Sequence, residues 1–279
     1  MEHTKKKFSI YNQNVVGYVI IMPWLVGFLC FTLVPFLMSF VLSFTNFNIL
    51  SPDTKFVGLD NYVKLFTQDK LFIKSLKVTF KFAFISVPLR LIFALLVAMI
   101  LNRKSRAVPV YRVVYYLPSI IGGSVAVSVM WRNLFTKAGV INSLLQAVGI
   151  DCRLNWLSNT KTALFTLILL YVWQFGSSML IFLSGLKQIP VSYYEAAEVD
   201  GAGKVRQFFS ITLPLLSPII LFNLVMQIIN GFMVFTQAQI ITDGGPVNET
   251  LVYILYLYQN SFKYYEMGYG SAMAWILLV

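Results

Sequence analysis

The amino-acid sequence predicts an all-α membrane protein, a bundle of about six transmembrane helices. Hydrophobic residues make up 58% of its 279 residues and charged residues only 12%, about half the charged fraction of a soluble domain. Stretches without any Asp, Glu, Lys or Arg cover residues 8–52, 113–131, 162–186 and 207–242. Each reaches or nearly reaches the roughly 20 residues with which a helix crosses the hydrocarbon. Because backbone groups in lipid must bond within their own segment, helices are the expected structure.

Six spans follow in chain order. We expect them at residues 18–44, 78–101, 113–135, 161–186, 211–241 and from 269 onward. Pro35 is expected to bend the first span, and Pro214 and Pro218 to kink the start of the fifth. Only about ten residues remain for the last span, too few to cross a bilayer, so the last helix is expected to be truncated. The predicted domains are a tail of residues 1–16 and a transmembrane domain of residues 17–279.

The short connections that are richest in Lys and Arg lie on one side of the expected bundle. Residues 1–16, 102–112 and 187–206 hold ten of the 22 Lys and Arg residues. Basic residues near span ends concentrate on the cytoplasmic side of a membrane, so these three segments are predicted to be cytoplasmic. The longer connections on the opposite side also carry lysines. The two sides therefore differ more in the number of Lys and Arg per residue than in their total number.

The polar segment between the fourth and fifth spans has the signals of a short helix with defined ends. Ser192 and Glu195 have the spacing of a capping box, in which each side chain bonds a backbone amide at the start of a helix. Gly201 follows Asp200 and can adopt the left-handed conformation that ends a helix without a Cβ penalty. About two turns remain, residues 193–200, with two alanines in the middle that let another surface approach the backbone.

The same segment carries a longer motif. It runs through Glu195-Ala196-Ala197, Asp200-Gly201-Ala202 and Ile211-Thr212-Leu213-Pro214. This motif resembles the EAA loop of ABC importer permeases and is most similar to that of the carbohydrate type, the maltose and glycerol-phosphate permeases. Further stretches resemble the same family: Tyr116-Leu117-Pro118-Ser119, Gly139-Val140-Ile141-Asn142, residues 183–190 and Thr242-Asp243-Gly244-Gly245-Pro246. The resemblance covers nearly the whole chain.

The resemblance implies a permease subunit of an ATP-driven ABC importer. Such a subunit translocates a sugar, here a mono- or oligosaccharide, that an extracellular binding protein delivers. Residues 187–210 would form a cytoplasmic coupling loop, whose short coupling helix docks into an ATPase subunit. The coupling residues would be Glu195, Ala196, Ala197, Asp200, Gly201 and Ala202.

The resemblance also implies partners and a location. The partners are two ATP-binding subunits, a second permease subunit that is a related but different chain, the extracellular substrate-binding protein, the sugar and membrane lipid. The location is the bacterial cell membrane, the inner or plasma membrane, crossed several times with the N-terminus in the cytoplasm.

No catalytic or metal-binding constellation is found in the sequence. The one histidine is His3, and Cys30 and Cys152 have neither the number nor the spacing of a metal site or disulfide framework. Residues 201–204, Gly-Ala-Gly-Lys, are followed by Val205 instead of the Ser or Thr of a phosphate-binding loop. We therefore expect no enzyme activity, no cofactor and no metal, with ATP hydrolysed by a separate chain. The net charge of +11 lies beside the spans, where it suits anionic lipid and not nucleic acid.

Side-chain amides recur on one face of the fifth span. Asn223, Gln227 and Asn230 are spaced i, i+4 and i+7, which places them on the same side of a helix. Two interpretations are equally supported: the amides hold helices together, or they line a polar path for substrate. Gln174 of the fourth span is expected to complement them in a substrate pathway.

Arg90 lies near the middle of the second span, where a charge is unfavourable. The favoured interpretation is that Arg90 snorkels, or that the span is shifted so that Arg90 lies nearer an end, with Pro88 disturbing the helix. The alternative is that its side chain faces protein or water inside the bundle.

A self-contained secondary transporter or channel is the alternative to an ABC permease. It would need internal repeats and ion-coupling carboxylates within the membrane. No Asp or Glu lies inside a span between the second and the fifth, which disfavours this class. Copurification with an ATPase would separate the two classes.

Overall fold

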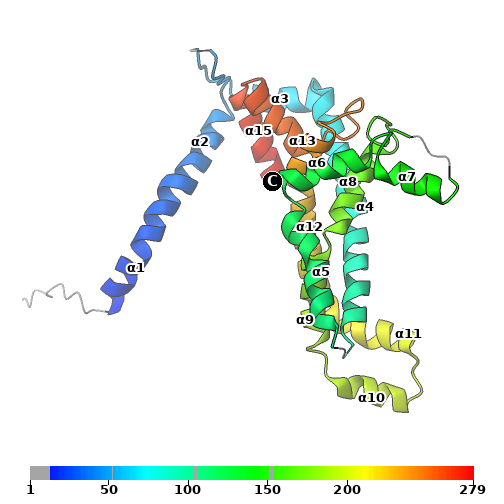
Figure 1. The fold of residues 1–279 in the computed structure, drawn as a ribbon. Coiled ribbons are helices and arrows are strands. Elements are labelled where there is room, and N and C mark those ends of the chain that lie inside the picture. The colour runs from blue at the N-terminus through cyan, green and yellow to red at the C-terminus, as the bar shows by residue number, and fades with distance from the viewer. Residues whose placement is uncertain (1–12, 52, 104–105, 151–153) are drawn as a thin grey trace, which may run out of the picture. The chain divides into compact units, whose positions relative to one another are not determined.

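A computed structural model describes residues 13–51, 53–103, 106–150 and 154–279. Within these ranges the secondary structure is helical apart from an isolated antiparallel bridge between Thr45 and Phe56. The chain forms two compact units (Figure 1), one from residues up to Gln68 together with Leu257–Val279, the other from Asp69–Tyr256. The predicted all-α class is confirmed.

The first unit joins the two ends of the chain. Its helices are α1 (Gln13–Phe28), the π-helix η1 (Leu29–Leu33), α2 (Val34–Leu42), α3 (Asp60–Thr67), the π-helix η3 (Gln259–Lys263) and α15 (Met267–Leu278). From Val16 to Leu42 the helix is continuous over 27 residues, and none of its most apolar stretch is buried. Its apolar side chains therefore face outward, as those of a helix in lipid do.

The irregularity predicted at Pro35 lies one turn earlier, at η1. Pro35 itself is in the first turn of α2, where its missing amide hydrogen is tolerated. Its ring would clash with the carbonyl group four residues before it in an α-helix. The wider π turn of η1, which ends two residues before the proline, relieves that clash and keeps the helix continuous.

Aromatic side chains pack α15 against α2 in the first unit. The indole ring of Trp275 lies 4.6 Å from the ring of Phe36 and 4.7 Å from that of Phe40, centroid to centroid. Its Nε1 donates a hydrogen bond to the Ser39 hydroxyl at 3.2 Å. Such tilted aromatic pairs contribute about 0.5–1.5 kcal/mol beyond the area they bury.

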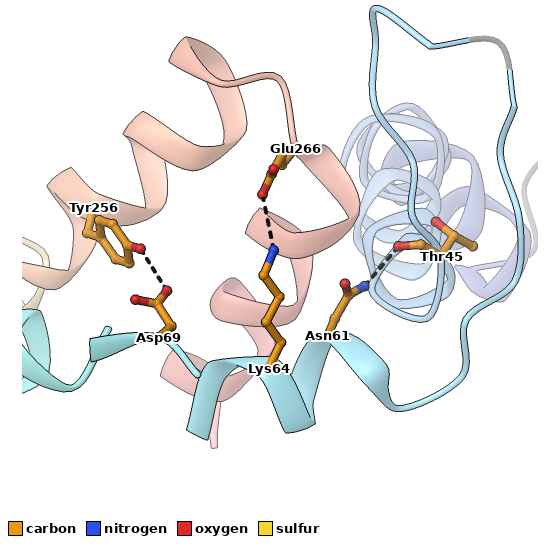
Figure 2. Close-up of polar contacts among 6 residues, drawn as sticks. All are labelled: Thr45, Asn61, Lys64, Asp69, Tyr256 and Glu266. Carbon is orange, nitrogen blue, oxygen red and sulfur yellow. Dashed lines mark hydrogen bonds and ion pairs between the residues drawn. The ribbon is translucent and has the colours of Figure 1, made fainter. Parts of the chain in front are cut away.

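Helix α3 ties the segment after α2 to the start of α15 (Figure 2). The Asn61 side-chain amide donates to the Thr45 backbone oxygen at 2.8 Å, and the Lys64 ammonium lies 3.9 Å from the Glu266 carboxylate. The backbone amide of Gly268 donates to the Phe47 oxygen at 2.9 Å. A Cβ at Gly268 would collide with the backbone oxygen of Thr45, so this close approach requires glycine.

The second unit contains the remaining helices. They are α4 (Lys70–Leu101), α5 (Val108–Ile121), α6 (Val125–Leu134), α7 (Val140–Ala147), α8 (Ala163–Trp173), α9 (Gly176–Leu186), α10 (Val191–Val199), α11 (Lys204–Gln207), the π-helix η2 (Phe208–Thr212), α12 (Leu213–Phe232), α13 (Thr236–Ile241) and α14 (Tyr253–Tyr258). The long helix α4 packs against α8, α9 and α12 and so forms the centre of the unit.

The start of α4 is fixed by one carboxylate (Figure 2). Asp69 accepts a hydrogen bond from the Phe72 amide at 2.9 Å as an N-cap, and a second from the Tyr256 hydroxyl at 2.7 Å. An N-cap of this kind contributes about 0.5–2 kcal/mol. The helix runs on from Lys70, eight residues before the predicted start of the span at residue 78.

Two predicted spans are broken helices. The third, expected as one helix over 113–135, is α5 and α6, whose axes differ by 97°. The fourth, expected over 161–186, is α8 and α9, bent by 41°. The first break coincides with Gly122 and Gly123, after which Ser124 caps α6 by accepting from the Val127 amide at 3.3 Å.

The fifth predicted span, 211–241, is displaced toward the N-terminus. The continuous helix runs from Lys204 to Phe232, and α13 is a separate short helix after it. The π-helix η2 ends two residues before Pro214, the same arrangement that precedes Pro35. A wide turn again accommodates the proline within an unbroken helix.

The number of spans is smaller than the predicted six within the part of the chain that the structure describes. Three helices are long and apolar enough to cross a membrane, over Val16–Leu42, Lys70–Leu101 and Lys204–Phe232, or up to five if each bent pair counts as one span. The last predicted span corresponds to α15, an apolar helix of 12 residues.

Candidate functional site

The first candidate site is the loop around α10. Helix α10 ends at the C-cap Asp200, and Gly201 follows with φ of +76°. The Ala202 amide donates to the Ala197 oxygen at 2.8 Å and the Gly201 amide to the Glu198 oxygen at 3.1 Å, which closes the helix. The left-handed glycine predicted from the sequence is therefore confirmed.

The predicted capping box is wrong. Pro190 is the N-cap residue of α10, and no side chain caps the helix. The proline has φ of −61° and ψ of 134°, so the helical geometry begins at Val191. Ser192 consequently lies inside the first turn, where its hydroxyl cannot take the N-cap role, and Glu195 has no reciprocal partner.

The side chains of α10 are available to a partner. None of them is buried, and Val191, Tyr193 and Val199 are exposed to 67%, 51% and 89%. Of the predicted coupling residues, Glu195, Ala196, Asp200 and Gly201 are exposed and Ala197 and Ala202 are half-buried. Exposed apolar side chains gathered on one short helix are typical of a surface that binds another protein.

Two contacts hold α10 to the rest of the second unit. The hydroxyls of Tyr194 and Thr212 are hydrogen-bonded at 2.9 Å, which connects α10 to the start of α12. The Lys204 ammonium donates to the Glu198 carboxylate at 2.6 Å, which connects α10 to α11. This hydrogen bond and the charge of Lys204 lower the pKa of the Glu198 carboxyl. These two contacts connect α10 to α11 and to the start of α12.

The second candidate site is a polar cluster between helices α4, α5, α8 and α12. An Nη2 of Arg90 donates to the backbone oxygen of Gln174 at 2.5 Å, and the Ser119 hydroxyl donates to the same oxygen at 2.8 Å. The guanidinium lies 4.5 Å from the centre of the Tyr171 ring. The Tyr171 hydroxyl donates to the Gln227 backbone oxygen at 2.9 Å. The break between α8 and α9 supplies the free carbonyl at its centre.

The favoured interpretation of Arg90 as a snorkelling residue is wrong. Arg90 is only 7% exposed. It lies 11 residues before Leu101, the last residue of α4, which corresponds to about 16 Å along the helix. That distance is beyond the reach of the side chain, so the guanidinium is stabilised by a carbonyl and an aromatic face within the protein.

The predicted pathway residues are only partly brought together. Gln174, Asn223 and Gln227 are 8%, 0% and 5% exposed, and the Gln174 amide donates to the Gly122 backbone oxygen at 3.2 Å. Asn230 is exposed, so the prediction that the three amides of the fifth span share one inward face is wrong for it.

The exposure of Asn230 follows from an oblique crossing of α12. Its buried residues are Leu216, Asn223, Gln227 and Gly231. From Asn223 to Gln227 and from Gln227 to Gly231 the spacing is four residues, and each such step turns the position by about 40° around the helix axis. The buried stripe therefore winds away from Asn230 toward Gly231, whose Cβ position lies against Val87 and Ala83 of α4.

Asn223 lacks side-chain hydrogen-bond partners among the described residues of this interior. Its side-chain nitrogen and oxygen are both buried and have no hydrogen-bond partner in the described part of the chain. An unsatisfied buried amide costs about 1–3 kcal/mol per group, so such a side chain needs a polar ligand or water. Asn223 differs in this from Gln227, which accepts a hydrogen bond from Tyr171 at 3.2 Å.

Sequence reasoning missed Ser119 and Tyr171 as members of the cluster. Ser119 closes the Tyr116–Ser119 motif, which was a resemblance without a structural role. Tyr171 lies three residues before Gln174, on the same face of α8, and that spacing was the available signal. Across the described ranges, no group of three His, Cys, Asp or Glu side chains is arranged to hold a metal ion.

Comparisons with known proteins identify the family of the chain. Residues 80–279 match the family described as binding-protein-dependent transport system inner membrane component. The chain is 57% identical over 277 residues to the probable ABC transporter permease protein YesP of Bacillus subtilis, covering 99% of this chain and 89% of that protein. It is 33% identical to the arabinooligosaccharides transport system permease protein AraP of Bacillus subtilis, covering 96% of this chain and 86% of AraP.

Other relatives extend the comparison. The chain is 32% identical to the trehalose/maltose transport system permease protein MalF of Thermococcus litoralis, covering 95% of this chain and 88% of that protein. Among solved structures, a chain of a bacterial alginate ABC transporter in complex with an alginate pentasaccharide-bound periplasmic protein superposes with a TM-score of 0.78. The two chains are 23% identical, and the match covers 94% of this chain and 88% of the other.

Proposed function

This chain belongs to the family of binding-protein-dependent transport system inner membrane components and is an ABC transporter permease, and we propose that it translocates a mono- or oligosaccharide delivered by an extracellular binding protein. Two relatives that are 33% and 32% identical are named as permeases for arabinooligosaccharides and for trehalose and maltose. The observation that carries the coupling part of the proposal is the exposed helix α10, closed by Gly201 and joined to α12 through Tyr194.

In this proposal α10 docks into an ATP-binding subunit, and two such subunits act on two permease subunits. The coupling residues are Glu195, Ala196, Ala197, Asp200, Gly201 and Ala202. The exposure of Glu195, Ala196, Asp200 and Gly201 and the exposed apolar side chains beside them support a protein partner at this helix. Only contacts that differ between two states couple one site to another, and the hydrogen bonds from α10 to α11 and α12 supply a path for that difference.

The proposed orientation places the loop 187–210 and the N-terminus in the cytoplasm. The high density of Lys and Arg in residues 102–112 and 187–206 supports it. The second permease subunit is proposed to be a related but different chain. It would cover the apolar surfaces that the described spans leave exposed.

The proposed substrate path runs along the polar side of α12. Asn223, with its unpartnered amide, Gln227 and Gln174 would line it, because sugar hydroxyls bond to side-chain amides at about 0.5–1.5 kcal/mol each. Asn230 remains in the proposal because its exposed amide is unfavourable against lipid. It would therefore face the path or the second permease subunit.

The test of this function begins with the intact tagged chain purified from its own membranes. We expect an ATP-hydrolysing subunit and a second permease to copurify. Reconstituted vesicles should take up a labelled sugar only with ATP and the matching binding protein. Uptake that proceeds without ATP, or uptake without any binding protein, would contradict the proposal.

A further inference from the structure

A pocket of about 520 Å³ lies in the second unit, where four helices end or begin. Its wall includes Asn102 after α4, Val108 at the start of α5, Leu186 at the end of α9 and Val191 at the start of α10. Its volume lies within the roughly 300–1,000 Å³ of ligand-binding pockets. Helix α10, whose Val191 and Tyr194 line the pocket, lies at the lower end of the second unit in Figure 1.

The charge of the pocket is positive. Arg103, Arg112 and Lys187 line it, and among the described residues no Asp or Glu does. The Nε of Arg112 is buried and has no hydrogen-bond partner in the described part of the chain. Three cations that share one pocket repel each other and attract an anion, and an arginine fork suits the oxygens of a phosphate.

The pocket also lies where apolar helices end. The apolar helices α4 and α9 end beside it, and α5 begins there. The ends of spanning helices meet the headgroup region of a bilayer. Apolar side chains such as Val108 and Leu186 line the pocket together with the cations, which suits a ligand with a charged head and an apolar body.

We propose that this pocket binds the phosphate of an anionic phospholipid headgroup. Arg103, Arg112 and Lys187 hold the phosphate, and the apolar wall contacts the lipid beyond it. Basic pockets at the ends of membrane helices bind headgroups through the same chemistry. A free phosphate ion offers the same oxygens but leaves the apolar wall and most of the volume unused. Because α10 begins at the wall, a bound lipid would steady the start of that helix.

The test compares lipid retention by the intact transporter and its variants. The complex is exchanged into nanodiscs of phosphatidylcholine with increasing phosphatidylglycerol, and the lipids that remain bound are counted by native mass spectrometry. Arg112→Gln and Lys187→Gln should each weaken phosphatidylglycerol binding about fivefold, which corresponds to about 1 kcal/mol per cation. Arg103→Gln combined with Arg112→Gln should weaken it about 25-fold.

Arg106→Gln is the matched control. Arg106 is exposed in the same connection but does not line the pocket, so its variant should retain the lipid as the unmodified protein does. Equal retention in Arg106→Gln, Arg112→Gln and Lys187→Gln would overturn the site. Retention of inorganic phosphate with no preference for phosphatidylglycerol over phosphatidylcholine would overturn the lipid as its ligand. Lys187→Gln, at the end of a helix, keeps the test valid if an arginine variant fails to assemble.

Discussion

Helix α10 presents its side chains outward, whereas Arg90 and its partners are enclosed between four helices of the same unit. α10 is fixed by two side-chain contacts, through Tyr194 and Glu198. Arg90, in contrast, is held by a carbonyl oxygen and an aromatic ring, and its neighbours Tyr171 and Gln174 each bond a further helix. The comparison teaches that this unit combines a loosely attached contact helix with a tightly connected interior.

The largest expected effect is on the interior, from Arg90→Met. The variant loses a charged hydrogen bond and a desolvated cation–π contact, so the assembled complex should lose about 2–3 kcal/mol of stability. Thermal unfolding of the purified complex measures this loss. Lys81→Met on the same helix is the control, because Lys81 is exposed. An unfolding midpoint for Arg90→Met equal to that of the control would show that the cluster is not what holds the interior together.

The next effect concerns the end of α10. Gly201→Val forces a β-branched residue to φ of +76°, at a cost of about 1–3 kcal/mol. No atom lies within 4 Å of the Cβ position, so the strain comes from the backbone alone. We expect normal membrane insertion but poor recovery of the ATP-binding subunit in pull-downs.

Gly203→Ala is the matched control for that variant. Its Cβ position is equally open, but its φ is −68°, which alanine adopts freely. Glu195→Ala should not unfold α10, because no capping box forms, and any loss of ATPase recovery in it would report docking directly. If Gly201→Val and Gly203→Ala behave alike, the left-handed turn is not needed for docking.

A smaller effect separates a path from packing in the interior. Asn223→Leu removes an amide without a partner, whereas Gln227→Leu removes one bonded to Tyr171. We expect Asn223→Leu to raise the sugar concentration for half-maximal uptake at unchanged complex yield. Gln227→Leu should also lower the yield, by about 0.5–1.5 kcal/mol of stability. Uptake kinetics normalised to the amount of assembled complex distinguish a role in the substrate path from a role in helix packing. Normal kinetics for Asn223→Leu would exclude Asn223 from the substrate path.

The smallest effect is the pH dependence of the α10 attachment. The folded-state pKa of Glu198 is below its ordinary value of 4.5 because Lys204 is hydrogen-bonded to it. The stabilisation of α10 by the hydrogen bond between Glu198 and Lys204 is therefore complete above pH 4.5. It is lost as the pH falls through the folded-state pKa of Glu198. Amide exchange in α10 and α11, corrected for intrinsic rates, should rise at acidic pH. In the Lys204→Gln variant, amide exchange in α10 and α11 should be fast already at neutral pH. Identical pH profiles of exchange in the variant and the unmodified protein would contradict the role of the Glu198–Lys204 hydrogen bond.

The sequence predicted a structural feature correctly where a single local property, such as the absence of charge or a glycine, determines that feature. The charge-free stretches located the helix Val16–Leu42 and α12 because lipid tolerates few charges, and Gly201 alone determined the end of α10. The resemblance to the EAA loop singled out residues 187–210, in which the structure has the exposed helix α10. The all-α class needed no more than the apolar fraction and these stretches.

Most errors in the sequence-based predictions arose where residues far apart in the sequence determine the local structure. Gly122 marks the break between α5 and α6, but a Cβ there would collide with the side chain of Gln174, a residue 52 positions away. The partners of Arg90 come from a break in another helix, which periodicity cannot place. The capping box failed for a local reason, because the extended conformation of Pro190 moved the start of the helix by two residues relative to Ser192.

The π-helical turns before Pro35 and Pro214 change which face of the helix each following residue occupies. Each π-helical segment, η1 and η2, accommodates one residue more than the α-helical turn it replaces. One extra residue shifts the angular register by about 100°. A helical wheel drawn without interruption from Lys204 to Phe232 therefore assigns the residues on one side of η2 to the wrong faces. The residues before and after η2 belong on two separate wheels, and an alignment gap at this place would leave both sets of faces in register.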